Sequence, residues 1–391
     1  MTVDGTGAEA VPRAVASLND GIERGLHLGA QVVVEHDGAM AADLAVGEQR
    51  AGVPMTRDAM VTWFSMTKPP VAVSVLQQWE RGALGLDDPV AQHVPEFAAH
   101  GKDGITLRHL LTHTAGIRDA DAVTSDATGD AWWDEIVAGI CATRPEEGWA
   151  PGRRAGYHLM CGMTMLAEVV RRVDGRRFEQ YVREEVFEPL GMHDCWVGMP
   201  FARHADYGDR IGTMHATSDP AAGAVPLAAL DSAVALARCV PGGGGRGPLH
   251  QYVQLYRALL RGGEVDGVRV LGPQTVEAMV ARHRVGLFDE TYHVPCDWGL
   301  GVQVDAYAMG GYSSPRTFGH GGALSSFTMA DPEHALIVAV QTNGMCGNDD
   351  HYDRFHGVMD AVYVDLGLAR EGALGREKPM PQVSFAAASA R

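Results

Sequence analysis

Apolar residues along the chain follow two spacings, one typical of helices and the other of strands. The segment 11–24 has apolar positions at helical spacing, and 156–175 and 251–263 repeat that pattern, each ending in glycine. The stretch 31–47 instead has two β-prone runs on either side of Asp37-Gly38, which predicts a hairpin. Strands and helices are therefore both expected early in the chain.

A similar alternation returns near the end of the chain. The segment 325–343 has a short β-prone run, a turn at Asp331-Pro332 and a longer apolar run, and 349–369 has the pattern of a closing helix. The length of 391 residues favours two lobes or two domains. We expect an α+β fold in one domain over 1–391, with a sheet-containing lobe (about 11–84 and 283–372), a mostly helical lobe (about 85–282) and a loose tail (373–391).

Four successive glycines interrupt the middle of the chain, in "VPGGGGRGP" at 240–248. Their spacing fits neither a P-loop nor a dinucleotide-binding GxGxxG motif. Glycine-rich stretches without such spacing are usually irregular and flexible. The sequence therefore predicts a mobile surface loop here.

The charge balance excludes some classes of partner. The chain has 32 Lys and Arg against 49 Asp and Glu, a net charge of −17, and no basic run. Such a chain lacks the electrostatic footprint of a nucleic-acid binder and is repelled by anionic membranes. The six cysteines are scattered without a CxxC pair, and the first residues lack the pattern of a signal peptide. We expect a cytoplasmic protein with reduced, mostly buried thiols.

The stretch "WFSMTKPP" at 63–70 places Ser65 three residues before Lys68 at the start of a helical pattern. One interpretation is structural, because serine is a good helix N-cap. The other is catalytic, because residues three apart share a helix face and a lysine with a lowered pKa can take the proton of a serine hydroxyl. The apolar residues around this pair could lower that pKa by desolvation. The SxxK spacing alone leaves both interpretations open.

Two further segments could complete an acyl-transfer site, which needs a second proton carrier and an oxyanion hole. "PGRRAGYHL" places Tyr157 between a Pro-Gly turn and a helix. "FGHGGALSSF" places His320-Gly321-Gly322 at the start of a predicted strand, where glycines allow close approach of the backbone.

These three motifs, in this order, resemble the serine β-lactamases and penicillin-binding proteins, for which SxxK is a hallmark. The strongest likeness is to class C β-lactamases and family VIII carboxylesterases. Three flanking stretches support it: "GALGLDDPVAQHVPEF", "ITLRHLLTHTAGI" and "VFEPLGMHD". The resemblance covers about residues 11–368 and implies a β-lactamase-like fold, an antiparallel sheet flanked by helices beside a mostly helical lobe, with the site between them.

The resemblance also implies roles for individual residues. Ser65 would be the nucleophile, Lys68 its general base, and Tyr157 the group that relays the proton and protonates the leaving group. The backbone N–H groups of Ser65 and Ala323 would form the oxyanion hole. Substrate would contact the positions that match or adjoin the family motifs: His158, Leu159, Trp298, His320, Gly321 and Gly322. For Trp298, core packing is an equal alternative.

The second and third motifs depart from the family pattern. Leu159 stands where relatives have an asparagine that holds the substrate amide, and His320-Gly321 stands where many have Lys-Thr, which recognises a carboxylate. We therefore expect an acyl enzyme that acts on a small cytosolic ester, amide or thioester and transfers the acyl group to water or to an alcohol or amine acceptor. The alternatives are a biosynthetic transacylase that uses an alcohol or amine acceptor, a β-lactamase or DD-peptidase, and a catalytically silent binding module.

Other classes of site have weaker support. His109 and His113 have the i, i+4 spacing of a helical zinc pair, but Leu110 stands where HExxH requires glutamate. There is no GxSxG motif, which excludes an α/β-hydrolase. We expect no metal, no cofactor, no nucleic acid and no membrane partner, and we leave a homo-oligomer open.

Overall fold

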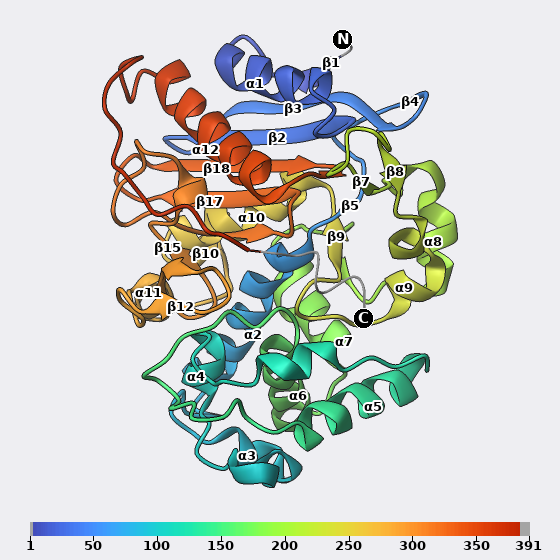
Figure 1. Ribbon diagram of the computed structural model, residues 1–391, viewed down its shortest axis with the longest axis vertical. Helices are drawn as coiled ribbons and strands as arrows, with labels where there is room; N and C mark the ends of the chain where they lie inside the picture. Colours follow the sequence, from blue (N-terminus) through green and yellow to red (C-terminus); the bar gives the residue numbers. More distant parts are fainter. Residues whose placement is uncertain (1–2, 384–391) are drawn as a thin grey trace.

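The computed structural model describes residues 3–383. No helix in this part of the chain is long and apolar enough to cross a membrane. A large antiparallel sheet lies on one side of the molecule, and most of the short helices gather on the other (Figure 1). This is the β-lactamase-like fold expected from the sequence motifs.

The main sheet has the strand order β1-β3-β2-β18-β17-β16-β15-β14, with β4 paired to β3. Every pairing in it is antiparallel. Its strands are β1 (Val3–Thr6), β2 (Gly29–His36), β3 (Ala39–Arg50), β4 (Val53–Pro54), β14 (Asp297–Trp298), β15 (Gln303–Val304), β16 (Phe318–Gly322), β17 (Ser326–Asp331) and β18 (Leu336–Thr342).

Short strands pair elsewhere in the chain. They are β5 (Val61–Thr62), β6 (Trp196–Val197), β7 (His215–Ala216), β8 (Val225–Pro226), β9 (Gly245–Gly247), β10 (Glu264–Val265), β11 (Val268–Arg269), β12 (Phe288–Asp289), β13 (Val294–Pro295) and β19 (Gly344–Met345).

The helices vary widely in length. They are α1 (Pro12–Glu23), α2 (Lys68–Glu80), α3 (Val90–His93), α4 (Leu107–Leu111), α5 (Gly129–Ala142), α6 (Cys161–Asp174), α7 (Phe178–Val182), α8 (Phe201–Tyr207), α9 (Ala233–Ala237), α10 (Leu249–Leu260), α11 (Pro273–Val280) and α12 (Asn348–Asp365), with 3-10 turns η1 (Phe64–Thr67) and η3 (Arg118–Ala122) near the site.

The central strands are buried on both faces, which explains their continuous apolar runs. Val32 and Val34 of β2 pack into the core that contains α1 and α12, while Val33 points to the opposite core. The helix α10 covers this second face and contacts β2, β17 and β18, although its residues fall in the range expected for the helical lobe. The hairpin predicted at Asp37-Gly38 is confirmed, with β2 and β3 on either side.

The helix α2 carries the SxxK motif from the sheet into the helical part of the chain (Figure 1). It begins at Lys68, and Ser65 lies in the preceding turn η1 rather than at an N-cap with a side-chain bond. Pro69 and Pro70 lie in the first turn of α2, where backbone N–H groups have no helical partner. The helix is almost wholly buried, from Lys68 to Gln78.

The glycine-rich stretch 240–248 is not a mobile surface loop, so that prediction is wrong. Gly242, Gly245 and Gly247 are buried, and β9 pairs with both β5 and β6. A Cβ atom on Gly242 would lie 2.7 Å from Cα of Met160, and one on Gly245 would lie 2.6 Å from Oγ1 of Thr67. The glycines are needed because two backbones approach closely, not because the loop moves.

Two other expectations also change. The described part of the predicted loose tail, residues 373–383, is hydrogen-bonded to the rest of the fold at several points, and residues 384–391 lie outside the described residues. The triplet His320-Gly321-Gly322 ends β16 rather than starting a strand. The backbone there must turn at once into β17, and glycine permits this tight approach.

Candidate active site

The turn that carries Ser65, η1 (Phe64–Thr67), is fixed by contacts to β9. The hydroxyl of Thr67 donates to the carbonyl of Phe64 and accepts from the N–H of Gly245, at 2.6 and 2.8 Å. Trp63 donates its backbone N–H to Gly245 and its indole N–H to Gly247. Phe64, directly before Ser65, has a φ of +50°, a strained value for a bulky residue. Strain of this kind persists only where the surroundings enforce it, and it is common at functional sites.

Lys68 is fully buried, and its amine nitrogen has three close neighbours. Nζ lies 2.8 Å from Oγ of Ser65 and 2.7 Å from the carbonyl oxygens of both Leu159 and Gly242. An uncharged amine has two N–H groups and one lone pair. The two carbonyls can accept the two N–H groups, which leaves the lone pair for the serine hydroxyl.

The surroundings of Lys68 favour this uncharged form. Burial lowers its pKa to about 7, and the carboxylate of Asp121 limits the drop. Burial disfavours the charged form because water no longer solvates it. Near neutral pH the amine is therefore available as a base.

The aromatic ring of Tyr157 lies beside the amine of Lys68. Its ring centroid is 4.9 Å from Nζ, and the side chain is 2% exposed. Burial raises the pKa of Tyr157 far above its ordinary value, and the neighbouring hydroxyls of Ser65 and Tyr292 oppose this only in part. The phenol thus keeps its proton at neutral pH. Its hydroxyl has no hydrogen-bond partner within residues 3–383, so it is bonded to neither Ser65 nor Lys68 in this arrangement.

A buried ion pair holds the backbone of Tyr157 in place. Asp289 accepts the backbone N–H groups of Tyr157 and Tyr292, and its other oxygen accepts from Arg284 at 2.9 Å. Both charged groups are buried, at 0% exposure for Asp289 and 2% for Arg284. Arg284 also lies over the ring of Trp298, which stacks on Tyr157. The phenol therefore has a rigid support.

The end of β16 packs closely against the turn η1 that carries Ser65. A Cβ atom on Gly322 would lie 2.0 Å from the carbonyl oxygen of Trp63, and Ser326 donates its hydroxyl to that same oxygen. This contact brings Ala323 beside Ser65 on the wall of one cavity. Neither of their backbone N–H groups donates a hydrogen bond within the described residues, so both could stabilise an oxyanion.

The cavity beside Ser65 is small, with a volume of about 30 Å³. Its wall is mostly aromatic and glycine-rich: Ser65, Tyr157, Tyr292, Gln303, Gly321, Gly322, Ala323, Leu324, Phe327, His351 and Tyr352. No Lys or Arg belongs to this set, so the cavity wall offers no cation to a substrate carboxylate.

Comparisons with known proteins identify the family of the chain. The β-lactamase family profile ("Beta-lactamase") matches residues 16–363, most of the chain. The chain belongs to the β-lactamase family. It is 28% identical over 363 residues to the esterase/β-lactamase LipL of Mycobacterium tuberculosis, covering 85% of this chain and 80% of LipL.

Two solved structures share the fold over nearly the whole chain. A penicillin-binding protein homologue from Caulobacter crescentus matches with a TM-score of 0.78, and a family VIII carboxylesterase with 0.77. Both are 27% identical and cover 94% of this chain and all of the other. The chain is thus a serine hydrolase or acyltransferase of the β-lactamase family.

The predicted substrate-binding residues of this β-lactamase family member divide into two groups. Gly321 and Gly322 line the cavity. His158, His320 and Trp298 are at most 1% exposed and are not part of its wall. Leu159 contributes its backbone, since its carbonyl accepts from Lys68.

His320 is not a cation at neutral pH. Burial, together with the neighbouring Lys68, lowers its pKa to about 3. Its Nδ1 lies 2.7 Å from the carbonyl oxygen of Gly321, so it donates to that group. It therefore does not replace the positive charge of the lysine that many relatives have at this position.

The two histidines considered as a zinc pair have separate structural contacts. The Nδ1 of His109 accepts the backbone N–H of Thr106 in the capping box of α4. His113 packs against Tyr157, and its Nδ1 accepts the backbone N–H of His158. No group of three or more potential metal ligands occurs within the described range 3–383.

Sequence reasoning missed Asp121, a carboxylate on η3. It accepts three successive backbone N–H groups, from Leu159 at 2.6 Å, Met160 at 2.8 Å and Cys161 at 2.7 Å. It therefore caps the start of α6 and fixes the Leu159 carbonyl that accepts from Lys68. A single aspartate five residues beyond the "LTHTAG" stretch at 111–116 carries no signal of this role.

Replacing Asp121 should change the pH at which the enzyme becomes active. Asp121 raises the pKa of Lys68 by its negative charge, so Asp121→Asn should lower it and move the acidic limb of kcat/KM by roughly 1 pH unit to lower pH. The measurement is a pH–rate profile with a neutral ester. Asp119→Asn, an exposed carboxylate on the same turn, should leave the profile unchanged. An upward shift, or equal shifts in both variants, would contradict this role.

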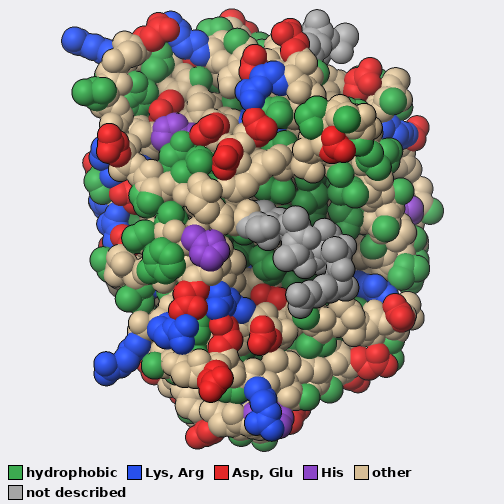
Figure 2. Space-filling model, viewed as in Figure 1, with side chains coloured by type: hydrophobic (Ala, Val, Ile, Leu, Met, Phe, Trp, Pro, Cys, Tyr) green, Lys and Arg blue, Asp and Glu red, His purple; other side chains and the backbone are tan. Residues whose placement is uncertain are grey.

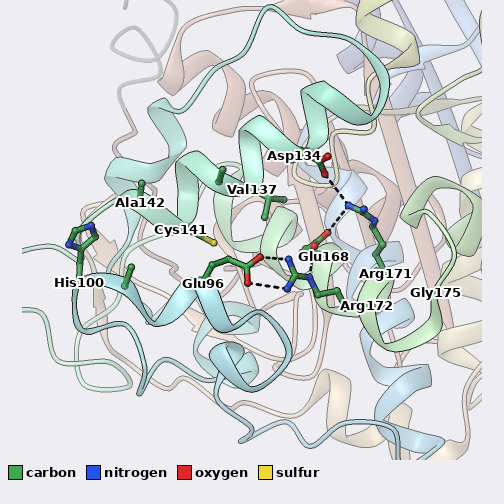
Figure 3. A pocket seen from close by; sticks show the side chains of 12 residues that line it. Glu96, His100, Asp134, Val137, Cys141, Ala142, Glu168, Arg171, Arg172 and Gly175 are labelled. Atoms are coloured by element: carbon green, nitrogen blue, oxygen red, sulfur yellow. Dashed lines mark hydrogen bonds and ion pairs between the residues drawn. The ribbon is translucent and has the colours of Figure 1, made fainter.

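A larger groove of about 780 Å³ lies in the helical part of the chain, between α5, α6 and the turn around Glu96 (Figure 3). Its charges are already paired: Arg172 with Glu96 and Glu168, and Arg171 with Glu168 and Asp134. None of its residues lines the cavity of Ser65. The groove therefore has no part in the chemistry at Ser65.

Proposed function

We propose that this protein is a carboxylesterase-like acyl enzyme that forms an acyl-Ser65 intermediate from a small uncharged ester and transfers the acyl group to water. The observation that carries this is the environment of Lys68. Its nitrogen lies within hydrogen-bond distance of two carbonyl oxygens and the hydroxyl of Ser65, so in the uncharged amine the carbonyls can accept both N–H groups and leave the lone pair for that hydroxyl. Amides and thioesters would react through the same intermediate.

In the first half-reaction, Ser65 Oγ attacks the ester carbonyl carbon while Lys68 takes its proton. The oxyanion that forms lies against the N–H groups of Ser65 and Ala323. When the intermediate collapses, the C–O bond to the alcohol breaks. Tyr157 protonates the departing oxygen and is reprotonated from Lys68. Water then attacks the acyl carbon while Lys68 takes its proton, the bond from that carbon to Ser65 Oγ breaks, and Lys68 returns the proton to Oγ, which releases the acid and restores both groups.

Recognition of β-lactams and peptides has less support. Those substrates carry a carboxylate, whereas the cavity wall contains no Lys or Arg, and His320 has a pKa of about 3. Acidic and basic side chains are interspersed over the face shown in Figure 2, without a broad basic patch that would attract anions. A transacylase remains the second candidate, because the small cavity limits access of water to the acyl-enzyme.

A substrate panel tests the proposal. We expect kcat/KM for a neutral short-chain ester to exceed that for nitrocefin by at least about a hundredfold. Added alcohol or amine acceptors at millimolar concentration should not change the yield of free acid. Efficient nitrocefin turnover would favour a β-lactamase, and acceptor products in excess of acid would favour a transacylase. Failure to acylate Ser65 with any ester or thioester would favour a binding module.

A further inference from the structure

The segment that follows α12 is anchored on the side of the molecule where the cavity lies. Arg376 and Lys378 both form ion pairs with Asp305, at 2.6 and 2.9 Å. Arg376 also donates its backbone N–H to the carbonyl of Gly311. The side chain of Lys378 is only 4% exposed. An irregular segment has no hydrogen-bond ladder of its own, so its course is set by such anchors.

Residues 381–383 are held by a second set of contacts. Asn348, at the start of α12, donates its side-chain amide to the carbonyl of Pro381 and accepts the N–H of Val383, at 2.9 and 3.1 Å. Between them, Gln382 donates its backbone N–H to the carbonyl of Tyr292 at 2.8 Å. The side chain of Asn348 thus binds the segment on both sides of Gln382, which contacts Tyr292, a residue of the cavity wall.

These contacts place Val383 against the active site. Val383 is 6% exposed and packs in one apolar cluster with Tyr157, Tyr292 and Trp298. Two members of this cluster, Tyr157 and Tyr292, form part of the cavity wall. The cavity of about 30 Å³ is far below the roughly 300–1,000 Å³ of typical small-molecule sites. The segment therefore stabilises the wall that keeps the cavity small.

We propose that residues 376–383 form a strap that limits the enzyme to short, uncharged acyl groups. This inference rests on the proposed esterase function and adds a determinant of acyl-chain length. The strap acts through Val383, which packs from outside the cavity in one apolar cluster with Tyr157 and Tyr292, two residues of the cavity wall. A longer acyl chain needs this wall to move, which requires breaking the contacts of Asn348, whereas an acetyl group does not.

The alternative is that the strap has a purely structural role and only stabilises the fold. The two roles differ in one readout. If the role is purely structural, loosening the strap lowers stability and changes kcat/KM for all substrates by the same factor. If the strap supports the cavity wall, loosening it changes the ratio of kcat/KM for long acyl groups to that for short ones, because each extra methylene in a pocket alters kcat/KM selectively.

The test uses the full chain and p-nitrophenyl esters from acetate to octanoate. In Val383→Ala and Asn348→Ala, the ratio of kcat/KM for octanoate to that for acetate should rise by at least roughly tenfold over the wild-type ratio. Leu374→Ala is the matched control, since Leu374 precedes the strap and is fully exposed. Its ratio should equal that of the wild type.

A second measurement separates failure of the strap from failure of the proposed function. The rate of Ser65 labelling by ethyl and octyl fluorophosphonates reports access without requiring turnover. Labelling with an unchanged octyl-to-ethyl ratio in both strap variants would overturn the strap while leaving the esterase intact. A rise that also occurs in Leu374→Ala would overturn it too. No labelling of Ser65 in any variant would overturn the proposed function and the strap together.

Discussion

Ser65→Ala should lower esterase kcat/KM by about 10⁴- to 10⁶-fold, the effect of removing the nucleophile from a serine hydrolase. Among the described residues that line the cavity, Ser65 has the one aliphatic hydroxyl. The thiol of Cys161, which interacts with Lys68, should not take its place, because it is buried and its pKa is raised. The measurement is steady-state hydrolysis of a short ester, with intact-mass detection of the acyl adduct.

Ser74→Ala provides the control for this substitution. Ser74 lies on the same helix α2, is fully buried, and donates its hydroxyl to the carbonyl of Pro70. Its loss should lower stability slightly and leave activity near the wild-type value. Residual activity in Ser65→Ala above about a hundredth of wild type, in a preparation free of contaminating esterase, would show that another group attacks the ester.

Lys68→Met should lower kcat/KM by about 10³-fold, within the range for loss of a general base. Methionine fills a similar volume but cannot take the proton of Ser65. The carbonyls of Leu159 and Gly242 lose their donor, which should lower the free energy of unfolding by about 1–3 kcal/mol. Activity and thermal unfolding should be measured on the same samples.

The chain offers a matched control in Lys102. This lysine is also fully buried, and its amine donates to the carbonyls of Ala99, Cys141 and Thr143. All three of its N–H groups thus have acceptors, and no hydroxyl is among its hydrogen-bond partners. Lys102→Met should cost similar stability without the loss of activity. Equal losses of activity in the two variants would mean that Lys68 matters for folding rather than for proton transfer.

The fold could be predicted from the sequence wherever the local hydrophobic pattern matches the burial of the residues in the structure. Apolar runs buried on two faces predicted β2 and β18, and Asp37-Gly38 predicted the hairpin between β2 and β3. Helix α6 ends before Gly175, which has the left-handed conformation expected of a C-cap glycine. The SxxK, Tyr and His-Gly-Gly motifs identified the family.

The remaining features depend on contacts between distant segments, which local composition does not encode. The run at 240–248 has the composition of a mobile loop, yet Gly242 supplies a carbonyl to Lys68 because its backbone packs against Met160. Asp121 and Asp289 act through backbone N–H groups that any residue could supply, so they form no motif. The anchors of the segment 376–383 are likewise single residues far away in the sequence.

The central claim is that an uncharged Lys68 takes the proton of Ser65 near neutral pH. The other titratable side chains around the amine are Tyr157, Cys161, His113, His320 and the carboxylate Asp121. Burial raises the pKa of Tyr157 and Cys161 and lowers that of both histidines, so none of these four should titrate near pH 7. A group whose pKa is lowered to about 7 becomes a base only above that pH.

The most direct measurement is the pH dependence of the single-turnover acylation rate of Ser65 with p-nitrophenyl acetate, between pH 5 and about 10.5. The account predicts a rate that rises with one ionisation at about pH 7 and then stays level, since the phenol of Tyr157 keeps its proton far above its ordinary pKa. A rate that keeps rising to a midpoint near the ordinary lysine value of about 10.4 would show that Lys68 is charged at neutral pH and is not the base.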